Sequence, residues 1–269
     1  MNKRLAACLT TVCMLLFGCA DTPEVFSSEP EAVPAIAVTD LTETDGLTEE
    51  YLLPDTVAAM PAGTVIDGTR IDPEHFGLYF TSEPISETVF ARINGISYQD
   101  NPNISPDDLR YLRMLHYTPD GGQAAGEMIV NKQIAADVLA IFRELYTMQY
   151  PIEKMLLIDE YGGDDEASMA DNNTSAFNYR VVAGTSTLSR HAVGMAIDLN
   201  PCMNPYITYN SDGTENISPE NAAAFADRCA SFQMKIDTSD AAYKLFTAYG
   251  FEWGGSWTTV KDYQHFEMN

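Results

Sequence analysis

Two of the four histidines in this 269-residue chain stand in short stretches that also carry carboxylates. His191 comes seven positions before Asp198, and Asp262 comes three positions before His265. His191, Asp198 and His265 offer two imidazoles and one carboxylate, which are ligand types that zinc accepts. Three protein ligands and an open position are typical of a catalytic zinc site, whereas a structural site is closed. Asp262 would remain free to act on a water molecule.

The spacing of His191 and Asp198 requires the chain to double back between them. On one strand they would lie about 23 Å apart on opposite faces, and on one helix about 10 Å apart along the axis. Neither arrangement lets both side chains reach one ion at about 2 Å. Gly194 can take a positive φ without steric cost, so we expect the reversal there. The apolar run at 195–199 then predicts a buried strand that carries Asp198 into the site.

A second short strand is expected at 264–268. Period-two alternation puts His265 and Glu267 on one face of this strand and Phe266 on the core face. Asp262 lies just before the strand, where a turn could direct its carboxylate at the metal site. The two predicted strands would therefore bring the ligands together from distant parts of the chain.

Each of these residues also has an ordinary structural interpretation. A histidine beside apolar residues is more often packed or hydrogen-bonded than bound to a metal. Asp198 could form a turn, Asp262 could cap one, and Glu267 could be a solvated charge. The coincidence of two histidine–carboxylate pairs favours the metal site. His75 and His116 have no such neighbours, so we expect both to be structural.

The pattern Ser189-x-His191-x-x-Gly194-x-Ala196-x-Asp198, followed by Asp262-x-x-His265-Phe266, resembles the zinc D-alanyl-D-alanine carboxypeptidase family. This family includes the VanY-type carboxypeptidases, the D-alanyl-D-alanine dipeptidases and the L-alanyl-D-glutamate endopeptidases of cell-wall lysis. The run from Gly250 to Trp257 is most similar to the endopeptidase branch. The resemblance covers roughly residues 178–269, and more loosely the chain from about residue 126.

The resemblance implies a zinc peptidase that hydrolyses peptidoglycan stem peptides, either as an endopeptidase or as a D,D-carboxypeptidase. It implies one zinc ion per chain, bound by His191, Asp198 and His265. Asp262 would be the general base that takes a proton from the attacking water. Arg180 stands where relatives carry an arginine before the first ligand, and its charge could stabilise an oxyanion. A non-hydrolytic lipoprotein that binds wall peptides through a metallopeptidase-like fold is the alternative, and a structural lipoprotein with buried histidines is a further one.

Four more side chains are candidates for supporting roles. Ser189 and Glu267 could accept a hydrogen bond from the outer N–H of a ligand histidine and so fix its tautomer, although both could equally be surface residues. Trp253 and Trp257 are the two tryptophans of the chain. We expect one of them to form a wall of the substrate cleft and the other to lie in the core.

The N-terminal segment predicts export. Lys3 and Arg4 precede an apolar run that is too short to span a bilayer comfortably, which is the layout of a signal peptide. Residues 16–19, Leu-Phe-Gly-Cys, resemble a bacterial lipoprotein processing box. We therefore expect residues 1–19 to be a lipoprotein signal with a lipidated Cys19, which anchors the protein to the membrane so that it faces the cell wall. An ordinary secretory signal or an uncleaved anchor would also export the chain.

Residues 20–69 contain no lysine or arginine and are rich in Asp, Glu, Pro, Ser and Thr. Such a composition predicts an acidic flexible tether. The whole chain has a formal net charge of −24, which argues against binding to nucleic acid or to anionic lipid headgroups. We expect peptidoglycan stem peptides as the partner, with the membrane reached only through the N-terminal lipid.

The remaining residues, about 200 of them, predict a single α+β domain with a mainly antiparallel sheet flanked by helices. The resemblance implies a hedgehog-like, D-Ala-D-Ala-peptidase-like fold. We expect an N-terminal extension at 70–125, packed on a zinc peptidase domain at 126–269. The expected elements are strands at 126–130 and 155–158, helices at 105–116, 132–148 and 240–249, and an acidic loop near the active site at 162–175.

Two cysteines remain near the C-terminal motifs, Cys202 and Cys229. Outside the cell they could form a disulfide, although two free thiols are also possible. Neither is expected to act as a nucleophile or a metal ligand, because no histidine lies at a matching spacing.

Overall fold

The computed structural model describes residues 51–182 and 184–269. One compact unit runs from Asp45 to Asn269, and all the described residues lie in it. The predicted signal peptide, Cys19 and the first part of the predicted tether lie outside the described residues. No helix within the described ranges combines the length and the apolar character that a membrane span needs.

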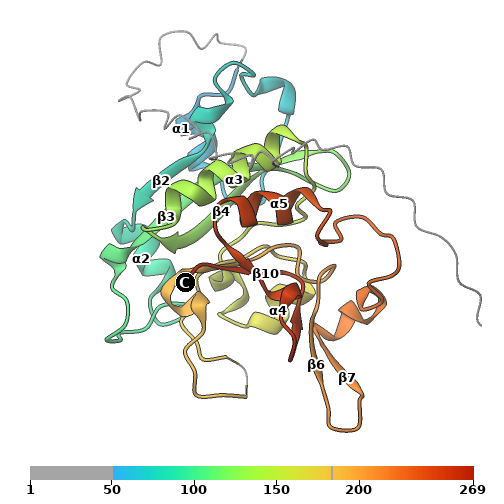
Figure 1. Cartoon of the computed structure of the whole chain (residues 1–269). Helices are drawn as coiled ribbons and strands as arrows, with labels where there is room; N and C mark the ends of the chain where they lie inside the picture. The colour runs from blue at the N-terminus through green and yellow to red at the C-terminus, as the bar shows by residue number, and fades with distance from the viewer. Residues whose placement is uncertain (1–50, 183) are drawn as a thin grey trace, which may run out of the picture. The chain divides into compact units, whose positions relative to one another are not determined.

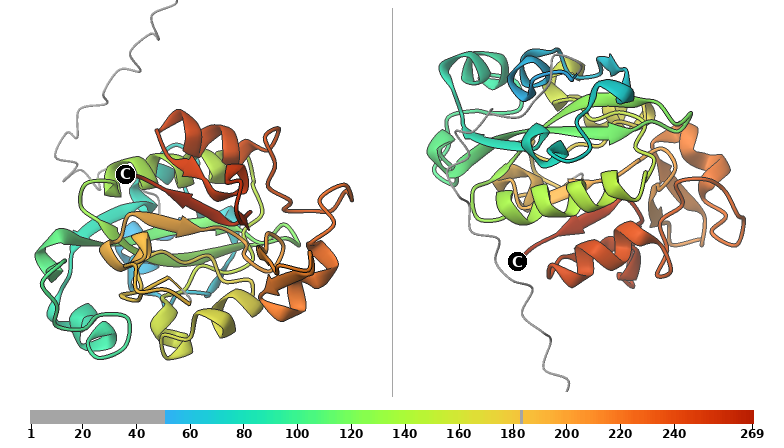
Figure 2. Two further views of the ribbon diagram at one scale, coloured as in Figure 1. Left: turned by 60° about the horizontal axis from the view of Figure 1, so that its bottom comes forward. Right: turned by 90° about the horizontal axis from the view of Figure 1, so that it is seen from above.

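A four-stranded antiparallel sheet forms the N-terminal half of this unit, with strand order β1-β4-β3-β2 (Figure 1). Its centre is a long hairpin of β3 (Leu109–Tyr117) and β4 (Gln123–Asn131). The edge strands are β1 (Val65–Ile66) and β2 (Thr81–Pro84). Helix α3 (Ala135–Thr147) lies along one face of this sheet, as the two views of Figure 2 show.

Two smaller antiparallel sheets carry the C-terminal part of the chain. In the first, β10 (His265–Glu267) lies between β5 (Ala196–Asp198) and β8 (Glu252–Trp253). In the second, β6 (Tyr206–Tyr209) lies between β7 (Glu215–Ser218) and β9 (Lys261–Asp262). All ladders between the named strands are antiparallel, which confirms the predicted α+β class.

Helices α3 and α5 (Ala241–Ala248) pack side by side through Phe142 and Phe246, whose rings meet edge to face with centroids 6.2 Å apart. Phe246 in turn stacks on Phe266 of β10, at 4.3 Å between centroids. Aromatic contacts of this kind add to the free energy gained by burying the rings. The core therefore continues from the large sheet through both helices to the strand that carries His265.

Three sequence predictions of local structure are confirmed. The helix predicted at 132–148 is α3, and the apolar residues on it and at its N-cap are buried, Leu139 partly and the others fully: Ile134, Val138, Ile141, Phe142 and Leu145. Asp240 caps α5 by accepting the backbone N–H of Ala242 at 2.9 Å. The short strands predicted at 195–199 and 264–268 are β5 and β10.

The helix predicted at 105–116 is wrong. Only a 3-10 turn forms there, η3 (Pro106–Asp108), and the chain then continues as strand β3. The strand predicted at 155–158 is also wrong, because it joins no ladder: the Met155 carbonyl accepts one hydrogen bond from Glu127, and Ile158 opens the 3-10 helix η4 (Ile158–Tyr161). The loop predicted at 162–175 contains the short helix α4 (Asp165–Ala170).

The predicted C-terminal boundary of the tether, residue 69, lies too far along the chain. Within it, α1 (Pro54–Ala59) and β1 are part of the fold, and β1 pairs with β4. Val57 and Ile66 are only 3% and 5% exposed and belong to the main core. The boundary predicted between residues 125 and 126 likewise falls inside β4. A segment without basic residues can still supply the few apolar side chains that complete a sheet edge.

Cys202 is buried and Cys229 is exposed, and both are free, so the predicted disulfide is not formed. The remaining elements among the described residues are α2 (Glu87–Ile93) and five 3-10 helices: η1 (Gly68–Arg70), η2 (Phe76–Tyr79), η5 (Arg190–Val193), η6 (Glu220–Phe225) and η7 (Gly254–Ser256).

Candidate metal centre

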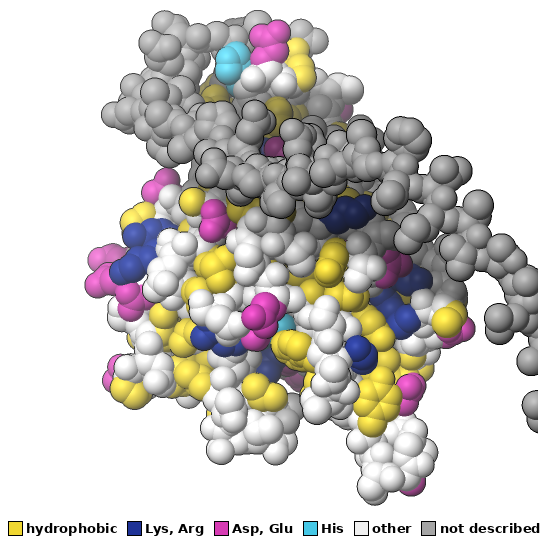
Figure 3. Space-filling model, viewed as in Figure 1, with side chains coloured by type: hydrophobic (Ala, Val, Ile, Leu, Met, Phe, Trp, Pro, Cys, Tyr) yellow, Lys and Arg dark blue, Asp and Glu magenta, His cyan; other side chains and the backbone are white. Residues whose placement is uncertain are grey.

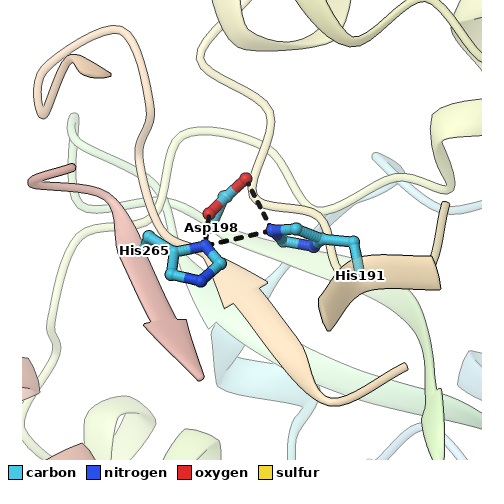
Figure 4. A group of neighbouring side chains, drawn as sticks. All are labelled: His191, Asp198 and His265. Carbon is cyan, nitrogen blue, oxygen red and sulfur yellow. Dashed lines mark hydrogen bonds and ion pairs between the residues drawn. The ribbon is translucent and has the colours of Figure 1, made fainter. Parts of the chain in front are cut away.

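His191, Asp198 and His265 point toward one another from η5, β5 and β10 (Figure 4). Nε2 of His191 lies 3.1 Å from Nδ1 of His265, and these nitrogens lie 3.1 and 3.0 Å from the two Asp198 carboxylate oxygens. All three residues are buried. On the face that Figure 3 shows, only small areas of histidine surface are visible. The three side chains thus form a compact group that could hold a metal ion.

The chain reversal that brings His191 and Asp198 together occurs at Gly194, as its position predicted. Gly194 ends η5 with φ +69°, and its N–H donates to the His191 carbonyl at 3.0 Å. A Cβ at this position would lie 2.6 Å from the backbone nitrogen of Asn131, so only glycine fits without a shift of the backbone. Strand β5 then runs antiparallel to β10, with Asp198 directly opposite His265.

The outer nitrogen of each ligand histidine faces a hydrogen-bond acceptor. Nδ1 of His191 lies 2.5 Å from the carbonyl oxygen of Ala176, and Nε2 of His265 lies 3.0 Å from a carboxylate oxygen of Glu267. Each outer nitrogen must therefore carry the proton and donate it, which leaves the inner nitrogen with its lone pair in the neutral ring. Such outer contacts orient metal-binding imidazoles and fix their tautomer.

Two imidazole lone pairs and a carboxylate converging in a buried place require a positive charge. Burial opposes charge on His265, but the hydrogen bonds to the carboxylates of Asp198 and Glu267 outweigh it and raise the pKa of His265 to about 10. Burial also opposes charge on Asp198, yet both histidines together hold the pKa of its carboxyl well below the ordinary value. The site favours a cation, and a set of two nitrogens and one oxygen fits zinc.

Asp262 lies on β9, beside the three converging side chains. Its Oδ1 is buried and has no hydrogen-bond partner among the described residues. Burial raises the pKa of Asp262 to about 7, and His265 offsets part of this rise. A carboxyl group with a pKa near 7 can both accept and return a proton at neutral pH.

Gly254 lets Asp262 approach the site closely. A Cβ on Gly254 would lie 2.7 Å from the Asp262 carbonyl oxygen and 3.3 Å from the Cβ of His265. The sequence alone did not indicate a role for Gly254. The one sequence feature that could have pointed to it is its place in the run 250–257, which resembles the endopeptidase branch.

Arg180 is held by an ion pair that the sequence did not predict. Its Nη2 lies 2.6 Å from Oδ2 of Asp165 on α4. Both charges act on Asp262: Asp165 contributes to raising the pKa of this carboxyl, and Arg180 lowers it. The acidic segment predicted near the active site therefore does lie there. Part of it forms helix α4, which carries Asp165, the partner of Arg180.

Ser189 supports the backbone of the site, whereas the two tryptophans lie in different surroundings. Ser189 contacts the backbone of His191 rather than its ring, because the hydroxyl accepts the His191 N–H at 3.2 Å and so caps η5. Trp253 is buried in the core, where Nε1 donates to the Tyr263 carbonyl at 2.9 Å. Trp257 is partly exposed, and its ring centroid lies 5.3 Å from that of His265. Trp257 is therefore the tryptophan that borders the site.

The other two histidines lie apart from this group, as expected. His75 contacts Asp72, with 2.9 Å between Nδ1 and a carboxylate oxygen. His116 is buried, and its Nδ1 donates to the Ile152 carbonyl at 2.8 Å.

Comparison with known families agrees with the motifs and the geometry. Residues 183–268 match the D-alanyl-D-alanine carboxypeptidase family. The matched segment contains all three converging residues and Asp262, so the predicted resemblance is confirmed there. The match covers less than half of the chain. No curated protein and no solved structure gives a significant match to the chain.

Proposed function

We propose that this protein is a zinc peptidase that hydrolyses peptide bonds in peptidoglycan stem peptides, with one zinc ion held by His191, Asp198 and His265. One observation carries the proposal. The outer nitrogens of both histidines donate to acceptors, so that both inner nitrogens face the Asp198 carboxylate, where a metal ion would take the place of the proton on His265. In a structural lipoprotein with ordinary buried histidines, nothing would require the side chains of His191, Asp198 and His265 to converge on a common point.

Zinc at this place would polarise the scissile carbonyl and lower the pKa of water to about 7. Asp262 takes the proton of the attacking water and returns it to the departing amine, a role that suits a carboxyl group with a pKa of about 7. Arg180 adds positive charge near the oxyanion, and Asp165 holds its guanidinium in place. Trp257 forms a wall beside His265.

Within this class we propose an endopeptidase ahead of a D,D-carboxypeptidase. A carboxypeptidase needs a cation that is free to bind the terminal carboxylate of its substrate. Arg180, which stands where relatives carry an arginine before the first ligand, is paired with Asp165 at 2.6 Å. The similarity of residues 250–257 to the endopeptidase branch supports the same choice.

We also propose that the protein is exported and anchored by a lipid on Cys19. The support is the sequence: a basic N-terminus, a short apolar run and the residues Leu-Phe-Gly-Cys at 16–19. A substrate in the cell wall would require this location. Mass spectrometry of the N-terminal peptide from cells tests the proposal, because a diacylglyceryl adduct on Cys19 is expected.

The experiment that tests the activity incubates the purified full chain with zinc and intact muropeptides and identifies the fragments by mass spectrometry. We expect cut stem peptides. The variant Asp262→Asn should retain zinc and lose at least about 100-fold in rate. Bound zinc with intact peptides would favour the non-hydrolytic binding protein instead, and an unchanged rate in the variant would remove Asp262 from its role.

A further inference from the structure

A cavity of about 410 Å³ lies beside the large sheet, and none of the metal-centre residues lines it. Residues 58–62, at the end of α1 and just after it, form one wall, and Leu156 and Glu160 form another. Arg92 of α2 and three residues of β3 and β4 complete the lining: Tyr111, Arg113 and Glu127. The proposed catalytic steps use none of these residues, so the cavity has no assigned role.

A buried network of charged side chains lines the cavity. Arg113 and Glu127 are directly paired across β3 and β4, so they share one face of the sheet, and their side chains are only 7% and 3% exposed. Glu127 accepts two hydrogen bonds from Arg92, at 2.8 and 2.6 Å, and one from the Tyr111 hydroxyl at 2.5 Å. Nε of Arg113 is buried without a hydrogen-bond partner among the described residues. Because buried ion pairs contribute little to stability by themselves, such a network beside a cavity points to binding.

The charges of the described residues that line the cavity cancel, because two arginines face two glutamates. Arg92 is bonded to both glutamates, and Nη1 of Arg113 lies 3.8 Å from Glu127. An anion would have to compete with a glutamate for an arginine, and a cation would have to compete with an arginine for a glutamate. The lining therefore favours a neutral polar ligand.

The rim of the cavity carries the ion pair of Arg92 and Glu160, which are 3.0 Å apart and whose side chains are 35% and 53% exposed. Arg92 uses three of its five N–H groups on the two glutamates, and the Glu160 carboxylate accepts only one hydrogen bond among the described residues. Free donors and a free acceptor therefore lie side by side. Two adjacent hydroxyl groups of a sugar ring match this arrangement, because one can accept while its neighbour donates. A peptide group presents its N–H and its carbonyl in opposite directions, so it would engage only one partner.

We propose that this cavity binds a saccharide through two adjacent hydroxyl groups, one of which accepts an N–H of Arg92 while the other donates to Glu160. The partly exposed ring of Tyr111, held by its bond to Glu127, offers apolar surface to the C–H face of the sugar. This site goes beyond the proposed peptidase function, because it uses neither the metal centre nor Asp262. It gives the protein a second binding site, which takes sugars rather than peptides.

Ligand-detected nuclear magnetic resonance titrations of the full chain without metal test the proposal. The probes are the methyl glycosides of glucose, galactose and mannose, and the 3-deoxy analogue of whichever binds most tightly, which has no adjacent pair of hydroxyl groups. We expect saturable binding of at least one glycoside with a millimolar Kd, and binding of its 3-deoxy analogue weaker by at least about five-fold. The variant Glu160→Ala, which changes an exposed side chain, should weaken glycoside binding by at least about five-fold. The control Glu252→Ala, which changes an exposed carboxylate on β8, should leave the Kd unchanged.

Three results would overturn the proposal: no saturable binding of any of the three glycosides, equal binding of the 3-deoxy analogue, or an unchanged Kd in Glu160→Ala. Acetate is titrated as well, and tighter binding of acetate than of every glycoside would show that the cavity takes an anion instead. Circular dichroism confirms that both variants are folded. Because the titrations need neither zinc nor a peptide, their outcome is independent of whether the protein cuts muropeptides.

Discussion

Nε2 of His191 lies 3.1 Å from Nδ1 of His265, although 74 positions separate the two residues in the chain. Each ring is turned so that its other nitrogen donates to an acceptor, the Ala176 carbonyl in one case and Glu267 in the other. If both imidazoles were neutral, their inner lone pairs would repel each other. In the metal-free protein the extra proton on His265 removes that repulsion, and a metal ion shared by both rings would take the place of this proton, which is why we interpret the arrangement as a metal centre.

Glu267 is predicted to strengthen metal binding without touching the ion. Its carboxylate accepts the outer N–H of His265 at 3.0 Å, and such contacts fix ligand orientation and raise ligand basicity. The variant Glu267→Gln should lower zinc affinity by about 10- to 100-fold, as measured by competition with a chelator of known affinity. Glu83→Gln, which changes an exposed carboxylate on β2, provides the control for the loss of one surface charge. Equal affinities in all three proteins would show that Glu267 does not support the site.

Zinc binding is predicted to release a proton at pH 8.5. With a pKa of about 10, His265 carries an extra proton in the metal-free protein at this pH, and the metal must displace it. Zinc affinity should consequently rise with pH up to about pH 10. Calorimetry in two buffers with different ionisation enthalpies measures the number of protons, and we expect at least one for each zinc ion. Asp262→Asn should release at least one as well, and release of none would contradict the protonation state assigned to His265.

Gly194→Ala is predicted to destabilise the fold strongly. The backbone φ of +69° strains any residue with a Cβ, and here the added Cβ would also lie 2.6 Å from the Asn131 nitrogen. Gly121 is a matched control, because its φ is +84° but no other atom lies within 4 Å of the place that a Cβ would take at this turn. We expect losses in the free energy of unfolding of about 1 kcal/mol for Gly121→Ala and at least about 2 kcal/mol for Gly194→Ala. Equal losses in denaturant titrations would mean that the close approach is not important.

The sequence predicted those parts of the site that depend on local pattern. The positive φ of Gly194, the alternation of His265, Phe266 and Glu267, and the cap of α5 at Asp240 all follow from a few neighbouring residues. These features need no knowledge of distant contacts. They were enough to predict that the chain turns back after His191.

The failures concern segments whose structure is decided by distant partners. The segment after Pro106 is a strand because β4 pairs with it along its whole length, from Leu109 to Tyr117. Most of the apolar run at 155–158 is buried although it joins no ladder, and Ile158 already begins η4. The pairing of Arg180 with Asp165 joins two segments that no local pattern connects. Tertiary contacts override local propensity in each case.

His116 is predicted to make the fold sensitive to acid. Burial lowers its pKa to about 4, and the hydrogen bond to the Ile152 carbonyl only partly offsets this effect, whereas an unfolded histidine keeps a pKa near 6.5. Between pH 6.5 and 4 the unfolded chain binds the additional proton, so the free energy of unfolding falls as the pH drops. This residue alone should contribute a loss of about 3 kcal/mol over that range.

Denaturant titrations at several pH values check this expectation. The variant His116→Gln should be less stable than the wild type at pH 7, because it lacks the ring, but its stability should decline less steeply between pH 6.5 and 4. Parallel declines in the two proteins would show that His116 does not control acid sensitivity.

The most direct measurement is the zinc content per chain of protein loaded with zinc and then dialysed, determined by mass spectrometry of the metal. The account predicts one zinc ion in the wild type and in His75→Ala, and none that survives dialysis in His191→Ala, Asp198→Ala or His265→Ala. Circular dichroism confirms that each variant is folded. A wild-type protein without zinc, or variants at His191, Asp198 and His265 that keep a full equivalent, would contradict the central claim.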